Sequence, residues 1–225
     1  MTGPAIFFTI LCPLFGAAYL LACAKKRYGP AFWLKGLAGL CFIGVCLSLA
    51  IEQAGLPYPR LIFFGLVFGL IGDQLLALRF LHPARGMAFF VSGAVAFAVG
   101  HVLYLSAMHR LDEGAWLFAL VPFALGLALA AVYVLRRDLD AGRLFVPGCV
   151  YIALVIAVAA MGTALFLRGQ GARALLLMLG GVSFAVSDCV LCVQAFGREK
   201  TTRRNVVLHV TYYAAQLLLA WSVAV

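Results

Sequence analysis

The sequence predicts an all-α polytopic membrane protein with eight transmembrane helices, and three observations support this fold class. Of the 225 residues, 65% are hydrophobic and 11% are charged. The mean hydropathy is +1.08, far above the range of water-soluble domains. The hydrophobic residues form runs of about 20, the length at which a helix crosses a hydrocarbon core roughly 30 Å thick. We therefore expect one integral membrane domain over residues 1–225.

Each expected helix is an apolar run bounded by charged or turn-forming residues. The eight runs cover residues 5–23, 31–51, 60–79, 87–107, 114–135, 145–167, 174–196 and 206–225. The segments that separate them are Lys25-Lys26-Arg27, Pro57-Tyr58-Pro59-Arg60, His82-Pro83-Ala84-Arg85, His109-Arg110-Leu111-Asp112-Glu113, Arg136 to Arg143, Arg168 to Arg173 and Arg198 to Asn205. The break after the third run is the weakest of these boundaries, and its proline and two arginines favour two helices over one.

The distribution of lysine and arginine predicts that both termini lie outside the cell. Thirteen basic residues flank the first, third, fifth and seventh connections, and four lie on the opposite side. The thirteen are Lys25, Lys26, Arg27, Lys35, Arg79, Arg85, Arg136, Arg137, Arg143, Arg198, Lys200, Arg203 and Arg204. Because basic loops stay in the cytoplasm, the first set is cytoplasmic. No basic residue precedes the first run and three follow it, which is typical of an uncleaved anchor with its N-terminus outside.

The net charge of +9 is explained by this topology and by contact with the anionic headgroups of membrane lipids. No loop is long enough to form a basic domain, so the sequence excludes nucleic-acid binding. All seven cysteines fall within or at the ends of apolar runs and are expected to be packing residues. The pair Cys189 and Cys192 has redox or metal spacing, but no second pair accompanies it, and no metal-binding group is expected.

Two acidic residues, Asp73 and Asp188, lie deep inside apolar runs. A carboxylate at membrane depth costs about 2.5–3.5 kcal/mol on insertion scales, so such a residue indicates a functional site with a nearby partner. A pair of carboxyl groups can carry out acid–base chemistry.

The two aspartates also belong to an internal repeat. A shift of 115 residues, which is 188 − 73, also aligns Gly65 with Gly180 and His101 with Gln216. This predicts two four-helix halves, 1–110 and 111–225, in parallel orientation, with both carboxyl groups reaching one central cavity.

Several other polar residues are candidates for lining that cavity. Glycines at positions 65, 69 and 72 favour close helix packing beside Asp73. His101 either faces the cavity or bonds a backbone carbonyl. Lys35 either extends to the lipid headgroups or faces inward, where it would pair with an aspartate or a substrate phosphate. Gln216 lies at mid-membrane and needs a partner.

Four motifs in this order resemble the YhhN-like lysoplasmalogenase family. They are Gly72-Asp73-x-x-Leu76, Gly100-His101-x-x-Tyr104, Ser187-Asp188-x-x-Leu191 and Tyr212-Tyr213-x-Ala215-Gln216. The likeness extends from Lys35 to Gln216, although Gly36 stands where the family usually has proline. It implies an alkenylglycerophospho-ethanolamine or -choline hydrolase of the cell membrane, which takes a lysophospholipid substrate and has no known metal or organic cofactor.

The chemistry that the resemblance implies matches the two buried acids. A vinyl ether is hydrolysed by proton transfer to its β-carbon, and water then captures the resulting cation. One carboxyl group would donate the proton and the other would stabilise the cation and orient water, as in glycosidases. The candidate catalytic residues are Asp73 and Asp188, and the candidate substrate-binding or orienting residues are Lys35, His101, Tyr104, Ser187, Tyr212, Tyr213 and Gln216.

Two other classes of protein could use the same sequence features. A proton-coupled membrane transporter of a small or lipid-like solute would use the buried acids as a relay, although such proteins often contain inverted repeats. A lipid-binding or scaffolding membrane protein without catalytic activity would need no paired acids.

Overall fold

The computed structural model describes residues 2–51, 55–135, 137, 139–198 and 200–225, with backbone only at 134 and 135. Arg136, one of the basic residues on which the predicted orientation is based, lies outside these described residues. The eight long helices are α1 (Gly3–Ala24), α2 (Tyr28–Ala50), α3 (Pro57–Leu81), α4 (Gly86–His109), α5 (Ala115–Leu135), α6 (Phe145–Leu167), α7 (Gly171–Phe196) and α8 (Thr202–Trp221). Within the described residues, all eight are long and apolar enough to cross a membrane. The predicted fold class is confirmed.

Local sequence signals set the helix ends, which differ from the predicted ends by a few residues. Helix α3 begins with Pro57 in its first turn, where the missing N–H of proline costs nothing. Helix α8 begins earlier than expected because Thr201 caps it, its hydroxyl accepting the Arg204 N–H at 3.2 Å. The short 3₁₀ helix Pro83–Arg85 separates α3 from α4, as the sequence predicts.

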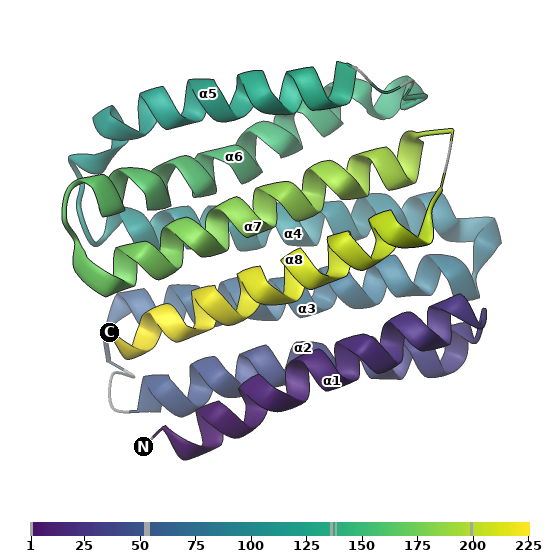
Figure 1. Ribbon diagram of the computed structural model, residues 1–225, viewed down its shortest axis with the longest axis horizontal. Helices are drawn as coiled ribbons and strands as arrows, with labels where there is room; N and C mark the ends of the chain where they lie inside the picture. Colours follow the sequence, from purple (N-terminus) through teal and green to yellow (C-terminus); the bar gives the residue numbers. More distant parts are fainter. Residues whose placement is uncertain (1, 52–54, 136, 138, 199) are drawn as a thin grey trace. The chain divides into compact units, whose positions relative to one another are not determined.

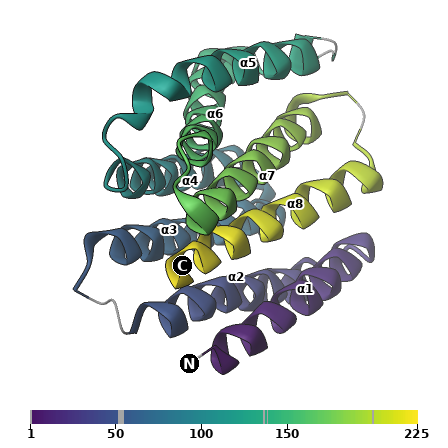
Figure 2. The ribbon, with the colours of Figure 1, turned by 60° about the vertical axis from the view of Figure 1, so that its left-hand side comes forward.

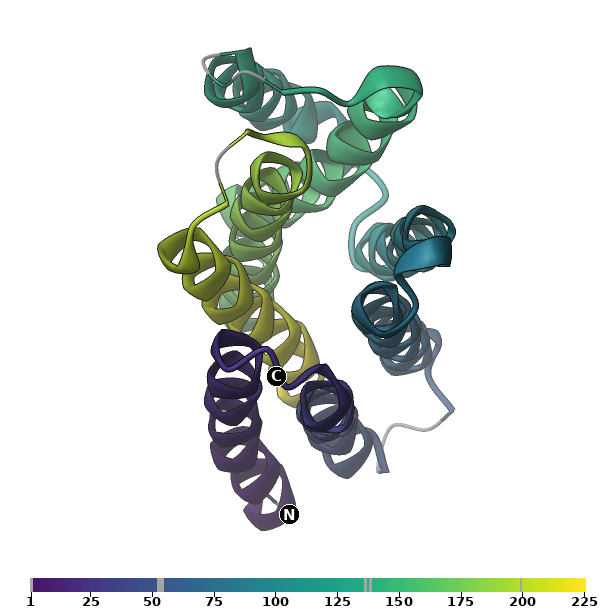
Figure 3. The ribbon, with the colours of Figure 1, turned by 90° about the vertical axis from the view of Figure 1, so that its right-hand side faces the viewer.

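The chain divides into two compact units, which consist mainly of Met1–Ala107 and Met108–Val223. In the first unit, α1 and α2 form the purple hairpin of Figure 1. The hairpin is joined by a Cys12 Sγ contact to the Ala38 carbonyl at 3.6 Å. Helices α3 and α4 also lie side by side, as Figure 3 shows from the end of the bundle.

In the second unit, α7 packs between α6 and α8, and α5 lies against α6 (Figure 2). Two glycines allow α6 and α7 to approach at backbone distance. A side chain at Gly162 would meet the Leu177 carbonyl, and one at Gly181 would meet the backbone of Ala159. This spacing is typical of membrane helices that pack through small residues.

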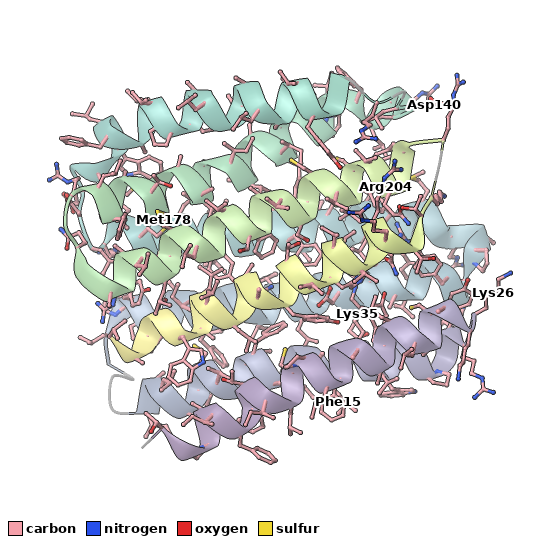
Figure 4. The ribbon with its side chains drawn as sticks, in the orientation of Figure 1. Phe15, Lys26, Lys35, Asp140, Met178 and Arg204 are labelled. Carbon is pink, nitrogen blue, oxygen red and sulfur yellow. The ribbon has the colours of Figure 1, made fainter. Side chains whose placement is uncertain are left out.

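The connections of the second unit alternate between its two ends. At one end Arg168 donates to the Asp112 carboxylate, which joins the α4–α5 and α6–α7 connections. This hydrogen bond holds the pKa of Asp112 below its ordinary value. At the other end the Asp140 N–H donates to the Phe196 carbonyl at 3.0 Å, near the labelled Asp140 and Arg204 in Figure 4. The direction in which the helices cross the membrane stays a prediction.

Candidate functional site

Each compact unit contains one of the two predicted membrane-depth aspartates. Asp73 lies on α3 in the first unit and Asp188 on α7 in the second, and their exposed fractions are 2% and 4%. In both units a side chain from the preceding helix contacts the carboxyl group. The two contacts differ in kind, so the units are described separately.

In the first unit Lys35 forms an ion pair with Asp73. The Lys35 Nζ lies 2.9 Å from Asp73 Oδ1, and Lys35 is 4% exposed. Its ammonium also lies 5.6 Å from the centre of the Tyr19 ring. In Figure 4 Lys35 lies within the length of the helices, whereas Lys26 points outward beyond the helix ends.

The interpretation of Lys35 as a residue that extends to the headgroups is therefore wrong. The alternative interpretation, in which it faces inward and pairs with an aspartate, is confirmed. The physical reason is depth. Helix α2 starts at Tyr28. Lys35 is thus seven residues along α2, about 10 Å at 1.5 Å per residue, and it faces α3.

The side chain that follows Asp73 lies against the backbone of α2. With its amide oxygen toward Gly36, Gln74 accepts the Gly36 N–H at 3.2 Å and donates to the Phe32 carbonyl at 3.3 Å. A Cβ at position 36 would collide with the Gln74 amide. The glycine that departs from the family pattern thus makes room for a side chain that ties α3 to α2 beside the ion pair.

On another side of α3, two glycines receive aromatic rings from α4. Gly65 lies under the ring of Tyr104, and Gly72 lies under the ring of Phe97. His101 is fully buried, and its Nδ1 donates to the Phe97 carbonyl at 2.6 Å. The rings of His101 and Tyr104 meet edge to face, 6.2 Å apart. These contacts place both predicted α4 residues in the α3–α4 packing.

In the second unit Tyr151 bonds the other aspartate. The Tyr151 hydroxyl donates to Asp188 Oδ2 at 2.5 Å. Sequence reasoning missed Tyr151, which lies near the start of α6 in an otherwise apolar helix. The internal repeat could have pointed to Tyr151. The shift of 115 residues places the counterpart of Lys35 at position 150, one residue from Tyr151.

The remaining predicted residues of the second unit lie at the α7–α8 contact. The Ser187 hydroxyl donates to the Leu208 carbonyl at 3.1 Å. Gln216, fully buried, donates to the Tyr212 hydroxyl at 2.9 Å. The Tyr212 ring meets those of Phe184 and Tyr213 edge to face, at 5.5 and 5.4 Å. Gln216 thus has a partner on its own helix.

The packing of α3 on α4 and of α7 on α8 follows one pattern at an offset of 115 residues. A side chain at Gly65 would meet Tyr104, and one at Gly180 would meet Leu219. Both members of the second pair are 115 residues beyond those of the first. Equivalent contacts inside each unit support the proposed repeat, which stays a prediction.

Metal ligands do not gather in the part of the chain that the structure describes. Within residues 2–51, 55–135, 137, 139–198 and 200–225, no three His, Cys, Asp or Glu side chains come together as a metal site would require. The seven cysteines are free thiols. The buried carboxyl, ammonium and phenol groups of Asp73, Asp188, Lys35 and Tyr151 can carry out acid–base chemistry.

The helices and the buried carboxyl groups define a multi-pass membrane protein with ionisable side chains in its interior. The sequence model of the YhhN family matches residues 30–223, so the chain belongs to the YhhN family. Lysoplasmalogenase TMEM86A of Bos taurus is 32% identical over 221 residues, which cover 94% of this chain and 87% of the relative.

Two human relatives are similar over the same extent. Human lysoplasmalogenase TMEM86A is 31% identical, with 94% of this chain and 87% of the relative covered. Human lysoplasmalogenase TMEM86B is 30% identical, with 89% of this chain and 90% of the relative covered. No solved structure matches the chain.

Proposed function

We propose that this protein is a lysoplasmalogenase of the cell membrane. It hydrolyses the vinyl ether bond of a lysoplasmalogen and releases a fatty aldehyde and glycerophospho-ethanolamine or -choline. The observation that carries the proposal is the pair of buried aspartates, Asp73 and Asp188, each bonded by a side chain of the preceding helix. Relatives that span nearly the whole chain and are named lysoplasmalogenases support it.

The two partners suggest different roles for the two carboxyl groups. An ion pair consists of an ammonium and a carboxylate, so Asp73 enters the reaction ionised and Lys35 balances its charge. Asp188 accepts a hydrogen bond from Tyr151 at Oδ2, so a proton on this carboxyl group sits at Oδ1. We therefore assign Asp188 as the proton donor and Asp73 as the base.

The first step transfers the Asp188 proton to the β-carbon of the vinyl ether. The carbon–carbon π electrons form the new C–H bond, and the positive charge is shared by the α-carbon and the ether oxygen. The Asp73 carboxylate stabilises this oxocarbenium ion and takes a proton from a water molecule as the water oxygen attacks the α-carbon. The product is a hemiacetal.

Collapse of the hemiacetal restores both carboxyl groups. The Asp188 carboxylate removes the hemiacetal hydroxyl proton, the C–O bond to glycerol breaks, and protonated Asp73 gives its proton to the leaving oxygen. One water is consumed, and one aldehyde and one alcohol are formed. The residues at the helix contacts would orient the substrate and the water; they are His101, Tyr104, Ser187, Tyr212, Tyr213 and Gln216.

The test is aldehyde release from a lysoplasmalogen by purified protein in detergent, with wild type compared with Asp73→Asn and Asp188→Asn. Asparagine keeps the size of the side chain but removes the transferable proton and the charge. Each variant should lose about 10²–10⁴-fold in turnover, the usual contribution of a general acid or base. The double variant should lose less than the product of the two losses, because both groups act on one substrate.

Asp140→Asn is the matched control, since Asp140 lies in the exposed α5–α6 connection. It should retain wild-type turnover. Activity within about threefold of wild type in either buried variant would show that its carboxyl group is not catalytic. Wild-type protein that releases no aldehyde but moves protons with a solute would contradict the hydrolase and identify a transporter.

A further inference from the structure

Arg79, near the Leu81 end of α3, is a half-buried cation that the reaction above does not use. Its guanidinium lies 4.6 Å from the centre of the Phe80 ring and 5.4 Å from that of Phe90. Arg79 takes part in neither the Lys35–Asp73 nor the Arg168–Asp112 ion pair. Its Nε is buried and has no hydrogen-bond partner within the described part of the chain.

These contacts favour an anion as the ligand of Arg79. The two aromatic rings hold the guanidinium in place, but a ring face supplies no hydrogen-bond acceptor of the kind that a guanidinium N–H needs. A buried donor without an acceptor is costly, and more so on a charged group. The planar fork of arginine matches the oxygens of a phosphate better than a lysine does.

Arg79 lies at a suitable distance from Asp73 for a lysophospholipid to reach both. Six residues of helix separate them, a rise of about 9 Å, and helical side chains lean back toward the N-terminus. The α-carbon of the vinyl ether, at which Asp73 acts, is six bonds from the phosphorus of a lysoplasmalogen, which is roughly 7 Å when three extended bonds span about 3.5 Å. Tyr19, whose ring lies 5.6 Å from the Lys35 ammonium, interacts electrostatically with both Asp73 and Arg79.

Lys35, the sequence-based candidate for the phosphate, is already engaged by Asp73. Arg85 is exposed in the connection that follows α3. We infer that Arg79 binds the phosphodiester of the substrate headgroup and thereby sets the vinyl ether against Asp73. This inference rests on the proposed function. The same chemistry could be supplied by the phosphate of a bilayer phospholipid, and the experiment separates the two sources.

The kinetic arm compares Arg79→Gln with wild type on two substrates, a lysoplasmalogen and a 1-alkenylglycerol that has no phosphate. For the lysoplasmalogen, KM should rise about ten- to a hundredfold, as loss of a charge-assisted hydrogen bond implies, while kcat stays close to wild type. For the alkenylglycerol, kcat/KM should be the same in both proteins. Arg79→Lys should recover part of the loss, and Arg85→Gln is the matched control with wild-type kinetics.

The binding arm needs no catalysis. It measures the Kd of a saturated 1-alkyl-glycerophosphocholine, which cannot be hydrolysed, for monodisperse wild type and Arg79→Gln. Binding should weaken by the same factor as the KM change, whereas a 1-alkylglycerol should bind both proteins equally. Diacyl phosphatidylcholine, added in mixed micelles at the same concentration, should not displace the alkyl ligand.

Three results would overturn the inference. They are unchanged binding of the alkyl lysophospholipid by Arg79→Gln, an equal loss with the phosphate-free ligand, and displacement by diacyl phosphatidylcholine. The last result would assign the arginine to bilayer lipid. If wild type binds the alkyl lysophospholipid through Arg79 yet releases no aldehyde from a lysoplasmalogen, the subsite stands and the proposed function fails.

Discussion

Each buried aspartate is bonded by a side chain of a different chemical type. Lys35 brings a full positive charge to Asp73, whereas Tyr151 brings a neutral hydroxyl to Asp188. Burying a charged group within a membrane protein is tolerated when a partner compensates it. The partners therefore distinguish two aspartates that the sequence presents as equivalent, and they underlie the proposed division into base and acid.

At this scale we expect Tyr151 to act as a positioning residue for Asp188. Tyr151→Phe removes only the hydroxyl and keeps the ring, so the carboxyl group loses the bond that fixes its orientation. Turnover should fall about ten- to a hundredfold with little change in KM, because the hydroxyl also stabilises the negative charge that develops on Asp188 as its proton leaves. Steady-state kinetics of aldehyde release measure the split between kcat and KM.

Tyr133→Phe on α5 is the matched control and should behave as wild type. The Tyr151→Phe change should have no further effect in an Asp188→Asn background, because the group that it positions is gone. If Tyr151→Phe reduced turnover equally in the wild-type and Asp188→Asn proteins, the hydroxyl would stabilise the fold and would not act through Asp188.

At the scale of the helix, α3 uses different faces for packing and for chemistry. One face packs against α4, where the Gly72 carbonyl lies close to Gly93. The positions 115 residues further on are Ser187 of α7 and Leu208 of α8, and there the Ser187 hydroxyl donates to the Leu208 carbonyl. Asp73 instead faces α2. The predicted glycine face and the acid thus belong to neighbouring sides of one helix, and the acid depends on how closely α2 approaches.

Gly36→Ala tests that dependence. The added Cβ would collide with the end of the Gln74 side chain, so the amide must move away and lose its hydrogen bonds to Phe32 and Gly36 of α2. Leaving the amide without these partners should cost about 1–3 kcal/mol, and turnover should fall because the contact that supports the ion pair from the next residue is lost. Thermal unfolding in detergent and aldehyde release measure the two effects.

Gly29→Ala, in the same helix with open space around it, should change neither stability nor turnover. Adding Gln74→Ala to Gly36→Ala should restore stability, since it removes the colliding amide. If Gly36→Ala alone matched wild type in both measurements, the close approach would not matter to the site.

At the scale of the whole molecule, the two aspartates belong to different compact units of one chain. The proposed reaction requires both carboxyl groups to reach one lysophospholipid. The reduced loss expected in the double Asp→Asn variant is therefore also a test of whether the two units serve one substrate. The predicted orientation adds that the ion pair and Arg79 lie toward the cytoplasmic side.

Accessibility of single cysteines tests this orientation. Lys200→Cys, introduced with Cys149→Ala to remove the exposed native thiol, should resist a membrane-impermeant maleimide in intact cells and react after permeabilisation. Lys200 is preferable to Thr201, whose hydroxyl caps α8. Glu113→Cys, at the opposite end of its unit, should react in intact cells. Labelling with the reverse pattern would place the termini inside the cell.

The sequence by itself determined the number of helices, the positions of Asp73 and Asp188 within apolar helices, and the family. These features are local, because the length of an apolar run and the cost of a carboxyl group within it do not depend on neighbouring helices. The sequence also singled out His101, Tyr104 and Gln216 as inward-facing candidates, and the structure buries all three.

Only the tertiary structure decided which side chains meet the two acids. These helices are apolar on every side, so periodicity does not show which face points inward. Lys35 pairs with Asp73 because α2 starts at Tyr28 and turns the Lys35 side chain toward α3. The apolar pattern of the sequence predicts neither of these two features. The contacts of Tyr151, Gln74 and Arg79 likewise come from the packing of one helix against its neighbour.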